Sequence, residues 1–305
     1  MNTPARSFAV GERVIGEGAP AFIVAEAGVN HNGDLALAER LIDVAAEAGA
    51  DAVKFQTFRT DALVSRAAPK AAYQREMTGV EEGQAAMLRP LELGPEQHVE
   101  LRDRCAKRGI VFFSTPFDAV SVDLLDSLGV PLFKIPSGEI TNLPFLRHVA
   151  AKGRPVILST GMATLDEVAQ AVTAVRESGD PPLALLHCVS AYPAPASEMN
   201  LRAMDTLRER FGSPVGLSDH TLGIEVALAA VARGAAIVEK HFTLDKRLPG
   251  PDHRASLDPG ELAALVRGIR LVEAALGDVE MRSMPSEADA RQVVRKSLVA
   301  ARAIR

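Results

Sequence analysis

The amino-acid sequence predicts an α/β protein, a (β/α)8 TIM barrel with a short N-terminal hairpin and a short C-terminal linker and strand. Eight short apolar segments recur along the chain, and each of them stops at a polar or charged residue. These segments are FIVAE (22–26), AVKFQ (52–56), IVFFST (110–115), LFKIPS (132–137), PVILST (155–160), LALLHC (183–188), PVGLSDH (214–220) and AIVEKH (236–241). The intervals between them are each long enough for one helix, so the chain alternates between strand and helix, as parallel barrels do. The segments are rich in Val, Ile, Leu and Phe rather than strictly alternating, which is typical of parallel strands covered by helices.

The length and composition agree with this prediction. The chain has 305 residues, whereas a TIM barrel needs roughly 250. We expect an N-terminal hairpin within residues 1–20, the catalytic barrel over 21–280, and a linker with a further strand over 281–305. The net charge of −5 argues against a nucleic-acid partner, which requires a basic surface. It is compatible with an anionic substrate, because one pocket of an acidic protein can be locally positive.

Targeting features favour a cytoplasmic protein. The two cysteines, Cys105 and Cys188, belong to different strand–helix units, so a disulfide framework is not expected. The first residues, MNTPARSFAVGERVIG, lack the apolar core of a signal peptide. No segment approaches the roughly 20 apolar residues that a membrane helix needs. We therefore expect neither a membrane nor a nucleic-acid partner.

Each further element has its own sequence pattern. Residues 7–19 alternate weakly between turn-like glycines and predict a hairpin that plugs the bottom of the barrel. Helices are expected over 34–49, 94–109, 118–128, 142–152, 164–178, 200–210, 222–233 and 258–276. Their predicted N-caps are Asp34, Asn142, Thr164, Asn200 and Asp258.

Two segments do not fit the repeating unit. Residues 57–93 form an excursion that is too long for a linker and predicts a functional loop or lid. The C-terminal RKSLVAARAIR (295–305) predicts a short linker and one strand with no partner after it. A lone strand is not stable, so this segment pairs with another chain, stays disordered, or begins a further domain.

The polar residues at the strand ends are the candidate site, because the C-terminal ends of barrel strands carry the active site. His220 and His241 close the seventh and eighth strands, which are neighbours in a barrel. Two imidazoles at matching heights can share one divalent metal and leave positions open for water or substrate. Two hydrogen-bonded histidines at the rim of the sheet are the alternative. An open site with oxygen ligands suits Mn²⁺, Mg²⁺, Co²⁺ or Zn²⁺.

Hydroxyl groups and lysines form a second set at the same ends. A phosphate group needs several donors together with positive charge, and the set as a whole favours an anion site over simple helix caps. Its members are Lys54, Thr115, Lys134, Ser137, Ser159, Ser190 and Ser218. Lys54 or Lys134 could instead form a Schiff base with a carbonyl substrate.

Carboxylates complete the candidate residues. Glu26 and Glu139 are potential acid–base groups, although each could instead be a structural ion-pair partner. Asp252 lies in a Pro- and Gly-rich loop after the eighth strand, where it either meets a polar substrate or forms a plain turn. His187 lies inside an apolar segment and is expected to be a satisfied core histidine.

Nine motifs in this order resemble the sialic acid synthase family, which includes N-acetylneuraminate, legionaminate and pseudaminate synthases. They are FIVAEAGVNHNGD, AVKFQTF, STPFD, KIPSGEITNLPFL, ILSTGMAT, HCVSAYPAP, GLSDHTLGIE, EKHFTLDK and GPDHRASLDP. The resemblance implies condensation of phosphoenolpyruvate with an open-chain N-acetylated amino sugar, such as N-acetylmannosamine or 2,4-diacetamido-2,4,6-trideoxy-mannose. The product would be a nine-carbon 2-keto sugar acid, with phosphate released by C–O cleavage. The SDHTLGIE and GPDHRAS segments look closer to the neuraminate and legionaminate branch.

The resemblance also implies roles for single residues. His220 and His241 would bind Mn²⁺, with Mg²⁺ or Co²⁺ as alternatives, and Glu139 would handle the proton of the water that adds to C2. The lysines and hydroxyls named above would hold phosphoenolpyruvate, with Ser190 standing where some members carry Asn. Glu26, Gln56, Tyr192 and Asp252 would contact the sugar.

Family members usually form homodimers and continue into an antifreeze-like domain that supplies an arginine to the partner's sugar site. The sequence ends at Arg305, about one strand into that region, so it is either a shortened form or a protein without this lid. From the resemblance we expect weakened sugar binding with an intact phosphoenolpyruvate and metal site. A Schiff-base aldolase on Lys54 or Lys134, or a lid-less ligand-binding paralogue without catalysis, are the alternative functions.

Overall fold

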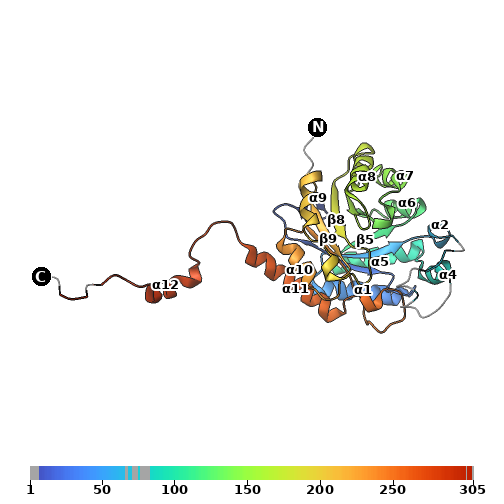
Figure 1. Cartoon of the computed structure of the whole chain (residues 1–305). Helices are drawn as coiled ribbons and strands as arrows, with labels where there is room; N and C mark the ends of the chain where they lie inside the picture. Colours follow the sequence, from blue (N-terminus) through green and yellow to red (C-terminus); the bar gives the residue numbers. More distant parts are fainter. Residues whose placement is uncertain (1–6, 66–67, 71–74, 76–82, 300, 304–305) are drawn as a thin grey trace.

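The computed structural model describes residues 7–65, 68–70, 75, 83–299 and 301–303. Its centre is an eight-stranded sheet with the order β5-β4-β3-β10-β9-β8-β7-β6, and every ladder printed between neighbouring strands is parallel. The strands are β3 (Phe22–Gly28), β4 (Ala52–Thr57), β5 (Val111–Pro116), β6 (Phe133–Ile135), β7 (Val156–Ser159), β8 (Leu183–Cys188), β9 (Val215–Asp219) and β10 (Ile237–His241). The two end strands, β5 and β6, lie against each other, so the sheet curls into a nearly closed barrel (Figure 1). The predicted fold class and all eight predicted strands are confirmed.

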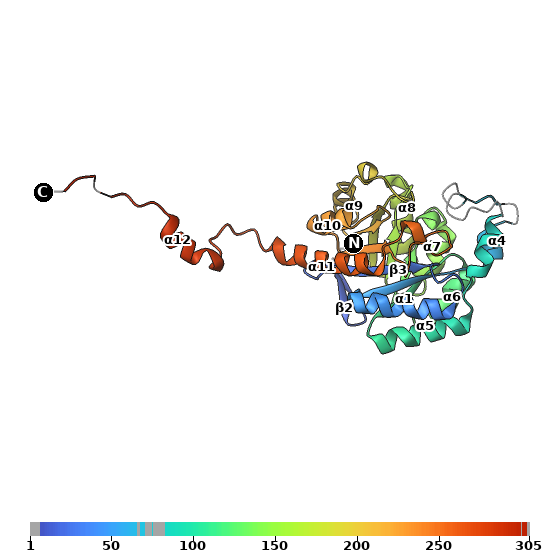
Figure 2. The same cartoon turned by 90° about the horizontal axis from the view of Figure 1, so that it is seen from below.

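Helices surround this sheet (Figures 1 and 2). The long ones are α1 (Leu35–Ala48), α5 (Pro95–Arg108), α6 (Ala119–Ser127), α7 (Leu143–Ala150), α8 (Leu165–Glu177), α9 (Ala203–Phe211), α10 (Glu225–Ala232) and α11 (Pro259–Leu276). The short ones are α2 (Thr60–Leu63), α4 (Gln84–Leu88), α12 (Ala288–Val294) and the 3-10 turns η1 (Arg89–Leu91), η2 (Ser137–Glu139), η3 (Ala196–Glu198), η4 (His253–Ala255) and η5 (Pro285–Glu287). Within the described residues, no helix is long and apolar enough to cross a membrane.

The helix caps mostly follow the sequence prediction. Asp34, for example, accepts hydrogen bonds from the backbone N–H groups of Ala36 and Leu37, which satisfies donors that the first turn of a helix leaves free. Asn142, Thr164 and Asp258 cap their helices in the same way. The prediction for Asn200 is wrong: α9 begins later, at Ala203, and no side chain caps it. Asn200 instead has a left-handed backbone with φ of 41°, a conformation that asparagine tolerates in turns.

The N-terminal hairpin closes the bottom of the barrel, as predicted. β1 (Ser7–Val10) and β2 (Arg13–Gly16) pair antiparallel. The side chains of Phe8, Val10 and Ile15 are buried against the inward-facing apolar residues at the start of the barrel strands. That inner layer consists of Phe22, Val24, Ala52, Phe113, Leu132, Ile157, Ala184, Leu186 and Ile237. The lower half of the barrel is therefore a packed core and not a channel.

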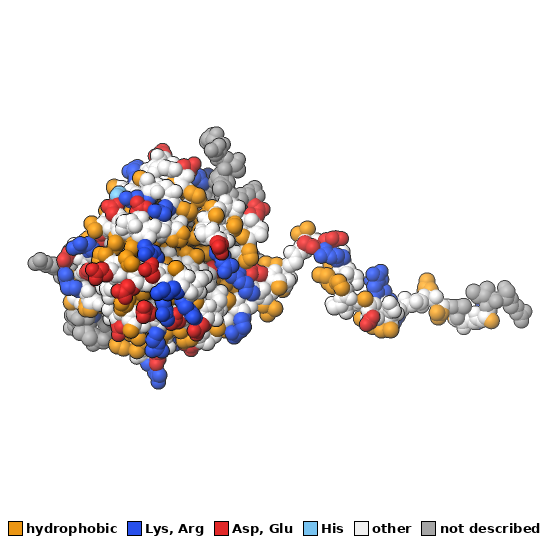
Figure 3. Space-filling model, turned by 180° about the vertical axis from the view of Figure 1, so that it is seen from behind, with side chains coloured by type: hydrophobic (Ala, Val, Ile, Leu, Met, Phe, Trp, Pro, Cys, Tyr) orange, Lys and Arg blue, Asp and Glu red, His pale blue; other side chains and the backbone are white. Residues whose placement is uncertain are grey.

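The excursion after β4 and the C-terminal segment differ from the repeating unit. The described part of the excursion holds α2, α4 and η1, and its Phe58 and Met87 pack with Val29, which follows β3, in a small separate core. The remainder of the predicted lid lies outside the described residues. After α11 the chain runs away from the barrel (Figures 1 and 2), and exposed apolar side chains such as Val279 and Val293 follow it (Figure 3). In the described part of residues 295–305 the predicted strand is not formed, and residues 296–299 have no regular structure; a strand needs a neighbour to pair with.

Candidate active site

Along each strand, the inward-facing side chain changes from apolar to polar from one inward-facing position to the next. Successive side chains of a strand point to opposite faces, so residues two apart share a face. Two positions beyond the inner apolar layer, the inward-facing residues are polar on almost every strand. They are Glu26, Lys54, Thr115, Lys134, Ser159, Cys188, Ser218 and Glu239, all of them buried. A cavity of about 460 Å³ opens above them at the C-terminal ends of the strands.

Four charged side chains form the floor of this cavity. Lys54 Nζ lies 2.8 Å from Glu26 Oε2 and 3.7 Å from Glu239 Oε2. Lys134 Nζ donates to Glu239 Oε1 at 3.2 Å. Acids and bases thus alternate in a continuous row, Glu26–Lys54–Glu239–Lys134. Because burying an isolated charge is costly, each of these groups depends on its neighbours.

The pKa values of the two carboxyl groups in this row are shifted in opposite directions. Burial raises the pKa of Glu26 to about 7, a rise that Glu239 reinforces and Lys54 opposes. Burial would also raise the pKa of Glu239, but Lys134 and Lys54 together lower it to about 2. Glu26 therefore exchanges its proton near neutral pH while Glu239 stays ionised. Pairs of carboxyl groups with separated pKa values are typical of acid–base sites.

Hydroxyl groups converge on one side of the floor. Ser137 Oγ accepts a hydrogen bond from the backbone N–H of Gly161 at 2.9 Å. A Cβ atom on Gly161 would lie only 2.4 Å from Ser190 Oγ and 2.7 Å from Ser137 Oγ, so only glycine fits between these two hydroxyls. Ser159 Oγ is buried and has no hydrogen-bond partner among the described residues. Unsatisfied buried donors are rare, and here they face a cavity that can accept a ligand.

Thr115 and Ser218 are held by the charged row itself. Lys54 Nζ donates to Thr115 Oγ1 at 2.7 Å. Ser218 Oγ donates to Glu239 Oε1 at 3.0 Å. The predicted hydroxyl–lysine set is thus brought together, and it presents the donor groups and positive charge that a phosphate group requires.

The histidine pair lies one tier above this floor. The ring centroids of His220 and His241 are 5.6 Å apart. His220 Nδ1 donates to the carbonyl oxygen of Val189 at 2.7 Å, which leaves Nε2 free to bind a ligand. Burial and the nearby charge of His220 lower the pKa of His241 well below 6.5, so His241 is neutral. Its Nδ1 is buried without a hydrogen-bond partner among the described residues.

This donor set fits a divalent metal with an open coordination sphere. Neutral imidazole is the commonest protein ligand for metals, water and substrate oxygens suit Mn²⁺ and Mg²⁺, and a backbone carbonyl behind a ligating histidine fixes its tautomer. Within the described part of the chain, no group of three or more His, Cys, Asp or Glu residues is placed to hold a metal ion. A metal bound by the pair would therefore complete its coordination with water or substrate oxygens.

The remaining predicted residues lie at different positions relative to the cavity. Gln56 Nε2 donates to Glu26 Oε1 at 3.4 Å, and the Tyr192 ring packs on His220 with centroids 4.1 Å apart. Asp252 is buried at the cavity, and that burial raises its pKa to about 6 although His220 opposes the rise. Glu139 is the exception: it is half-buried in η2, accepts from Asn142 Nδ2 at 2.7 Å, and is not among the residues that line the cavity.

Sequence reasoning missed one residue of the floor and two behind it. Cys188 faces inward, with Sγ 3.8 Å from His220 Nδ1; its spacing of two from Leu186 was the available indication. Asp219 of β9 and Lys240 of β10 form a buried ion pair on the outer face of these two strands. The interpretation of His187 is confirmed, since its Nε2 bonds to the carbonyl oxygen of Met199 at 2.5 Å.

The sequence profile described as the NeuB family matches residues 41–281. The chain belongs to the NeuB family. The N,N'-diacetyllegionaminic acid synthase of Campylobacter jejuni is 51% identical to this NeuB-family chain over 285 residues, which cover 93% of this chain and 85% of that protein. The protein of the same name from Legionella pneumophila is 52% identical over 281 residues, with 91% and 79% covered.

A solved structure of another relative supports the family fold. The N-acetylneuraminic acid synthetase of Leptospira borgpetersenii, in complex with citrate, superposes with a TM-score of 0.83 at 38% identity, covering 97% of this chain and 100% of that one. These relatives are named as synthases, and we conclude that the NeuB-family chain is an enzyme. This decides against a binding protein without catalysis.

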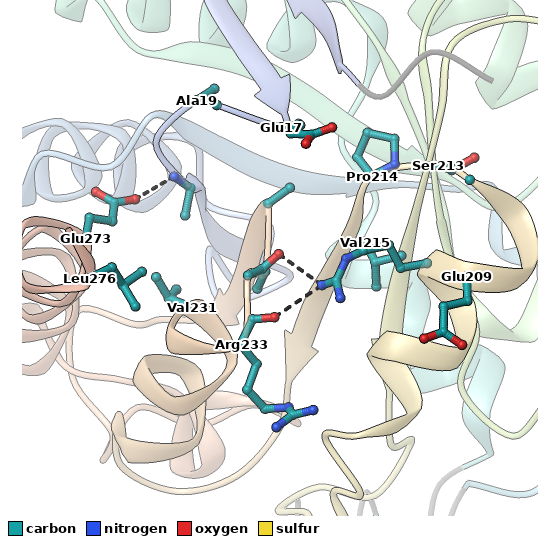
Figure 4. A pocket seen from close by; sticks show the side chains of 18 residues that line it. Glu17, Ala19, Glu209, Ser213, Pro214, Val215, Val231, Arg233, Glu273 and Leu276 are labelled. Atoms are coloured by element: carbon teal, nitrogen blue, oxygen red, sulfur yellow. Dashed lines mark hydrogen bonds between the residues drawn. The ribbon is translucent and has the colours of Figure 1, made fainter. Parts of the chain in front are cut away.

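A second and larger cavity, of about 720 Å³, lies at the opposite end of the barrel (Figure 4). Its wall includes the β2–β3 connection with Glu17 and parts of α9, α10 and α11. Arg208 donates there to the carbonyl oxygens of Arg233 and Gly234, and Glu273 accepts from the backbone of Ala21. These groups bind the loops to one another, whereas the buried charges that face open space lie in the smaller cavity.

Proposed function

We propose that this NeuB-family enzyme is a transferase that condenses phosphoenolpyruvate with an open-chain N-acetylated amino sugar. The product is a nine-carbon 2-keto acid of the sialic acid type, and inorganic phosphate leaves. One observation carries the proposal: a lysine–hydroxyl floor suited to a phosphorylated anion lies directly beneath two histidines suited to a metal, in one cavity. The names of the relatives support the same reaction.

Phosphoenolpyruvate binds at the floor of the cavity. Its phosphate and carboxylate groups meet Lys54 and Lys134, and its oxygens accept from the hydroxyls of the strand ends. Those hydroxyls belong to Thr115, Ser137, Ser159, Ser190 and Ser218, and Ser218 has to release Glu239 before it can donate to the substrate. Ser159 Oγ has no hydrogen-bond partner among the described residues, and Ser137 Oγ accepts from the backbone N–H of Gly161.

The reaction balances with these two substrates and one water. The methylene carbon of phosphoenolpyruvate attacks the aldehyde carbon of the sugar, and the aldehyde oxygen takes up a proton. Water then adds to the cationic C2 and loses a proton. The resulting tetrahedral centre collapses to the ketone and expels phosphate through its C–O bond.

His220 and His241 would hold a divalent metal, with Mn²⁺ preferred and Mg²⁺ or Co²⁺ as alternatives. When bound, the metal supplies Lewis acidity to the sugar aldehyde. The chain prepares this site by fixing His220 through Val189 and by keeping His241 neutral. Tyr192 packs against both rings and limits their rotation.

Glu26 is the proton-transfer group that the geometry favours. It lies in the cavity, and its pKa of about 7 suits exchange near neutral pH. Glu139 also remains a proposed catalytic residue, from the sequence; in that role its carboxylate has to leave Asn142 and turn toward the cavity. Both assignments predict lower kcat on substitution by glutamine.

The upper tier of the cavity takes the sugar. Gln56, Tyr192 and Asp252 offer polar contacts there, and Glu26 reaches the same space. On the opposite side, the excursion after β4 contributes Phe58 and Met87 to an apolar wall. An apolar wall suits the methyl groups of a 2,4-diacetamido-2,4,6-trideoxy sugar, in agreement with the names of the relatives at 51% and 52% identity. A homodimer stays a prediction.

The Schiff-base alternative rests on Lys54 or Lys134. Lys54 Nζ is already engaged in an ion pair with Glu26 at 2.8 Å. Burial lowers the pKa of Lys134, and its contact with Glu239 opposes that shift. Borohydride reduction in the presence of a carbonyl substrate distinguishes the two reactions, because only a Schiff base would be trapped on a lysine.

The proposal is tested by phosphate release from phosphoenolpyruvate with a panel of 2-acetamido and 2,4-diacetamido hexoses. We expect sugar-dependent release that a chelator abolishes and Mn²⁺ restores. His220→Ala and His241→Ala should each remove the Mn²⁺-dependent activity while the fold, followed by circular dichroism, is kept. Full activity in either variant, or release that ignores the sugar, would refute the assignment.

A further inference from the structure

A buried ion pair lies behind the histidine pair, on the outer face of the barrel wall. Lys240 Nζ donates to Asp219 Oδ2 at 2.7 Å. The side chains are 2% and 0% exposed, so neither charge is hydrated. Replacing such a pair by apolar residues is often neutral or stabilising. A contribution to stability alone therefore does not explain why two charged residues occupy these buried positions.

The position of the pair connects it to the candidate metal ligands. Asp219 and Lys240 are directly paired across β9 and β10. Each one immediately precedes a histidine, His220 on one strand and His241 on the other. Because only one peptide unit separates each of these residues from its histidine, a change in their distance or register also moves the two imidazole rings.

The pair also fixes the backbone on the far side of His220. Asp219 Oδ1 accepts from the backbone N–H of Thr221 at 2.9 Å and from its hydroxyl at 2.8 Å. Lys240 Nζ donates to the carbonyl oxygen of Thr221 at 2.8 Å. His220 is thus enclosed by a turn that Asp219 closes locally and that Lys240 ties to the neighbouring strand.

We propose that Asp219 and Lys240 form a cross-strand tie that sets the separation and the height of the His220 and His241 rings, and thereby the affinity of the metal site. The tie does not touch the metal or the substrates; both are positioning residues. The inference rests on the metal role of the histidines under the proposed function.

The test measures Mn²⁺ binding directly, by titration calorimetry and by electron paramagnetic resonance of free and bound Mn²⁺, on the full chain. Lys240→Met should weaken Mn²⁺ binding by about tenfold, the lower end of the effect of residues behind metal ligands. The double variant Asp219→Asn/Lys240→Met removes both charges and keeps an oxygen for Thr221. It should recover much of the unfolding free energy in urea, because no unpaired charge remains, yet keep the weakened Mn²⁺ binding.

Arg270→Met is the matched control. Arg270 Nη2 contacts the buried carboxylate of Asp51 at 2.8 Å, at the opposite end of the barrel strands. This variant should lose stability without a change in Mn²⁺ affinity. If the single and double Lys240 variants bind Mn²⁺ as the wild type does, the tie is purely structural and the inference is wrong. If the wild type binds no Mn²⁺, or binds it equally well without His220 and His241, the proposed metal site itself fails and the inference falls with it.

Discussion

The raised pKa of Glu26 makes the free energy of unfolding depend on pH. One substitution, Glu26→Gln, should remove this dependence. Glu26→Gln keeps the size of the side chain and an acceptor oxygen but cannot ionise. In the wild type, the folded pKa of about 7 exceeds the ordinary value of 4.5, mainly through burial. Folding therefore becomes less favourable as the pH rises from 4.5 to 7, because the unfolded chain releases this proton and the folded chain holds it.

The magnitude follows from the size of the shift. One pKa unit corresponds to about 1.4 kcal/mol, so the rise from 4.5 to about 7 is worth about 3 kcal/mol above pH 7. Glu26→Gln should unfold at nearly the wild-type urea concentration near pH 4.5. It should be more stable than the wild type by up to about 3 kcal/mol at pH 8.

Urea unfolding of the metal-free protein at pH 5 and pH 8, followed by circular dichroism, measures this difference. Ser159→Ala is the control, since it alters a buried residue of the same cavity without a titrating group. The difference between this control and the wild type should be alike at both pH values. A Glu26→Gln variant that is less stable than the wild type by the same amount at pH 5 and pH 8 would show that the burial argument is wrong.

Two further substitutions test the hydroxyl cradle and the barrel plug. Gly161→Ala places a methyl group between Ser137 and Ser190, within 2.7 Å of both hydroxyls. We expect the KM for phosphoenolpyruvate, measured by steady-state phosphate release, to rise about tenfold, which is equivalent to one lost hydrogen bond of about 1.4 kcal/mol. An unchanged KM would show that phosphoenolpyruvate binds elsewhere. Phe8→Ala empties part of the plug beneath the charged floor and should lower the unfolding free energy by about 3 kcal/mol, measured in urea; a loss below about 0.5 kcal/mol, as for a surface substitution, would mean that the hairpin is only peripheral.

The strands were predictable because their information is local. Each apolar segment ends at a polar residue, and the pleat alone assigns Lys54 and Gln56 to one face. The barrel closure then follows from the number of strand–helix units. The sequence did not predict which strand-end side chains lie at the same height in the barrel. That depends on the register between strands that are far apart in sequence.

The differences between the sequence-based expectations and the structure have the same origin. Asn200 has the composition of a helix cap, but the chain turns through a left-handed conformation before α9 begins. Glu139 follows its strand by several residues, so the turn after β6 and not the pleat decides its direction, and it points to Asn142. Asp219 and Lys240 have no sequence pattern that brings them together; the register of β9 and β10 pairs them, and both are buried.

The apolar plug closes the barrel beneath the charged floor, so among the described residues the cavity opens toward the C-terminal ends of the strands. Under the proposed function, phosphoenolpyruvate has to reach Lys54 and Lys134 before the sugar fills the upper tier, and phosphate has to leave after the sugar acid. The hairpin at the far end of the barrel would thus impose an order of binding and release.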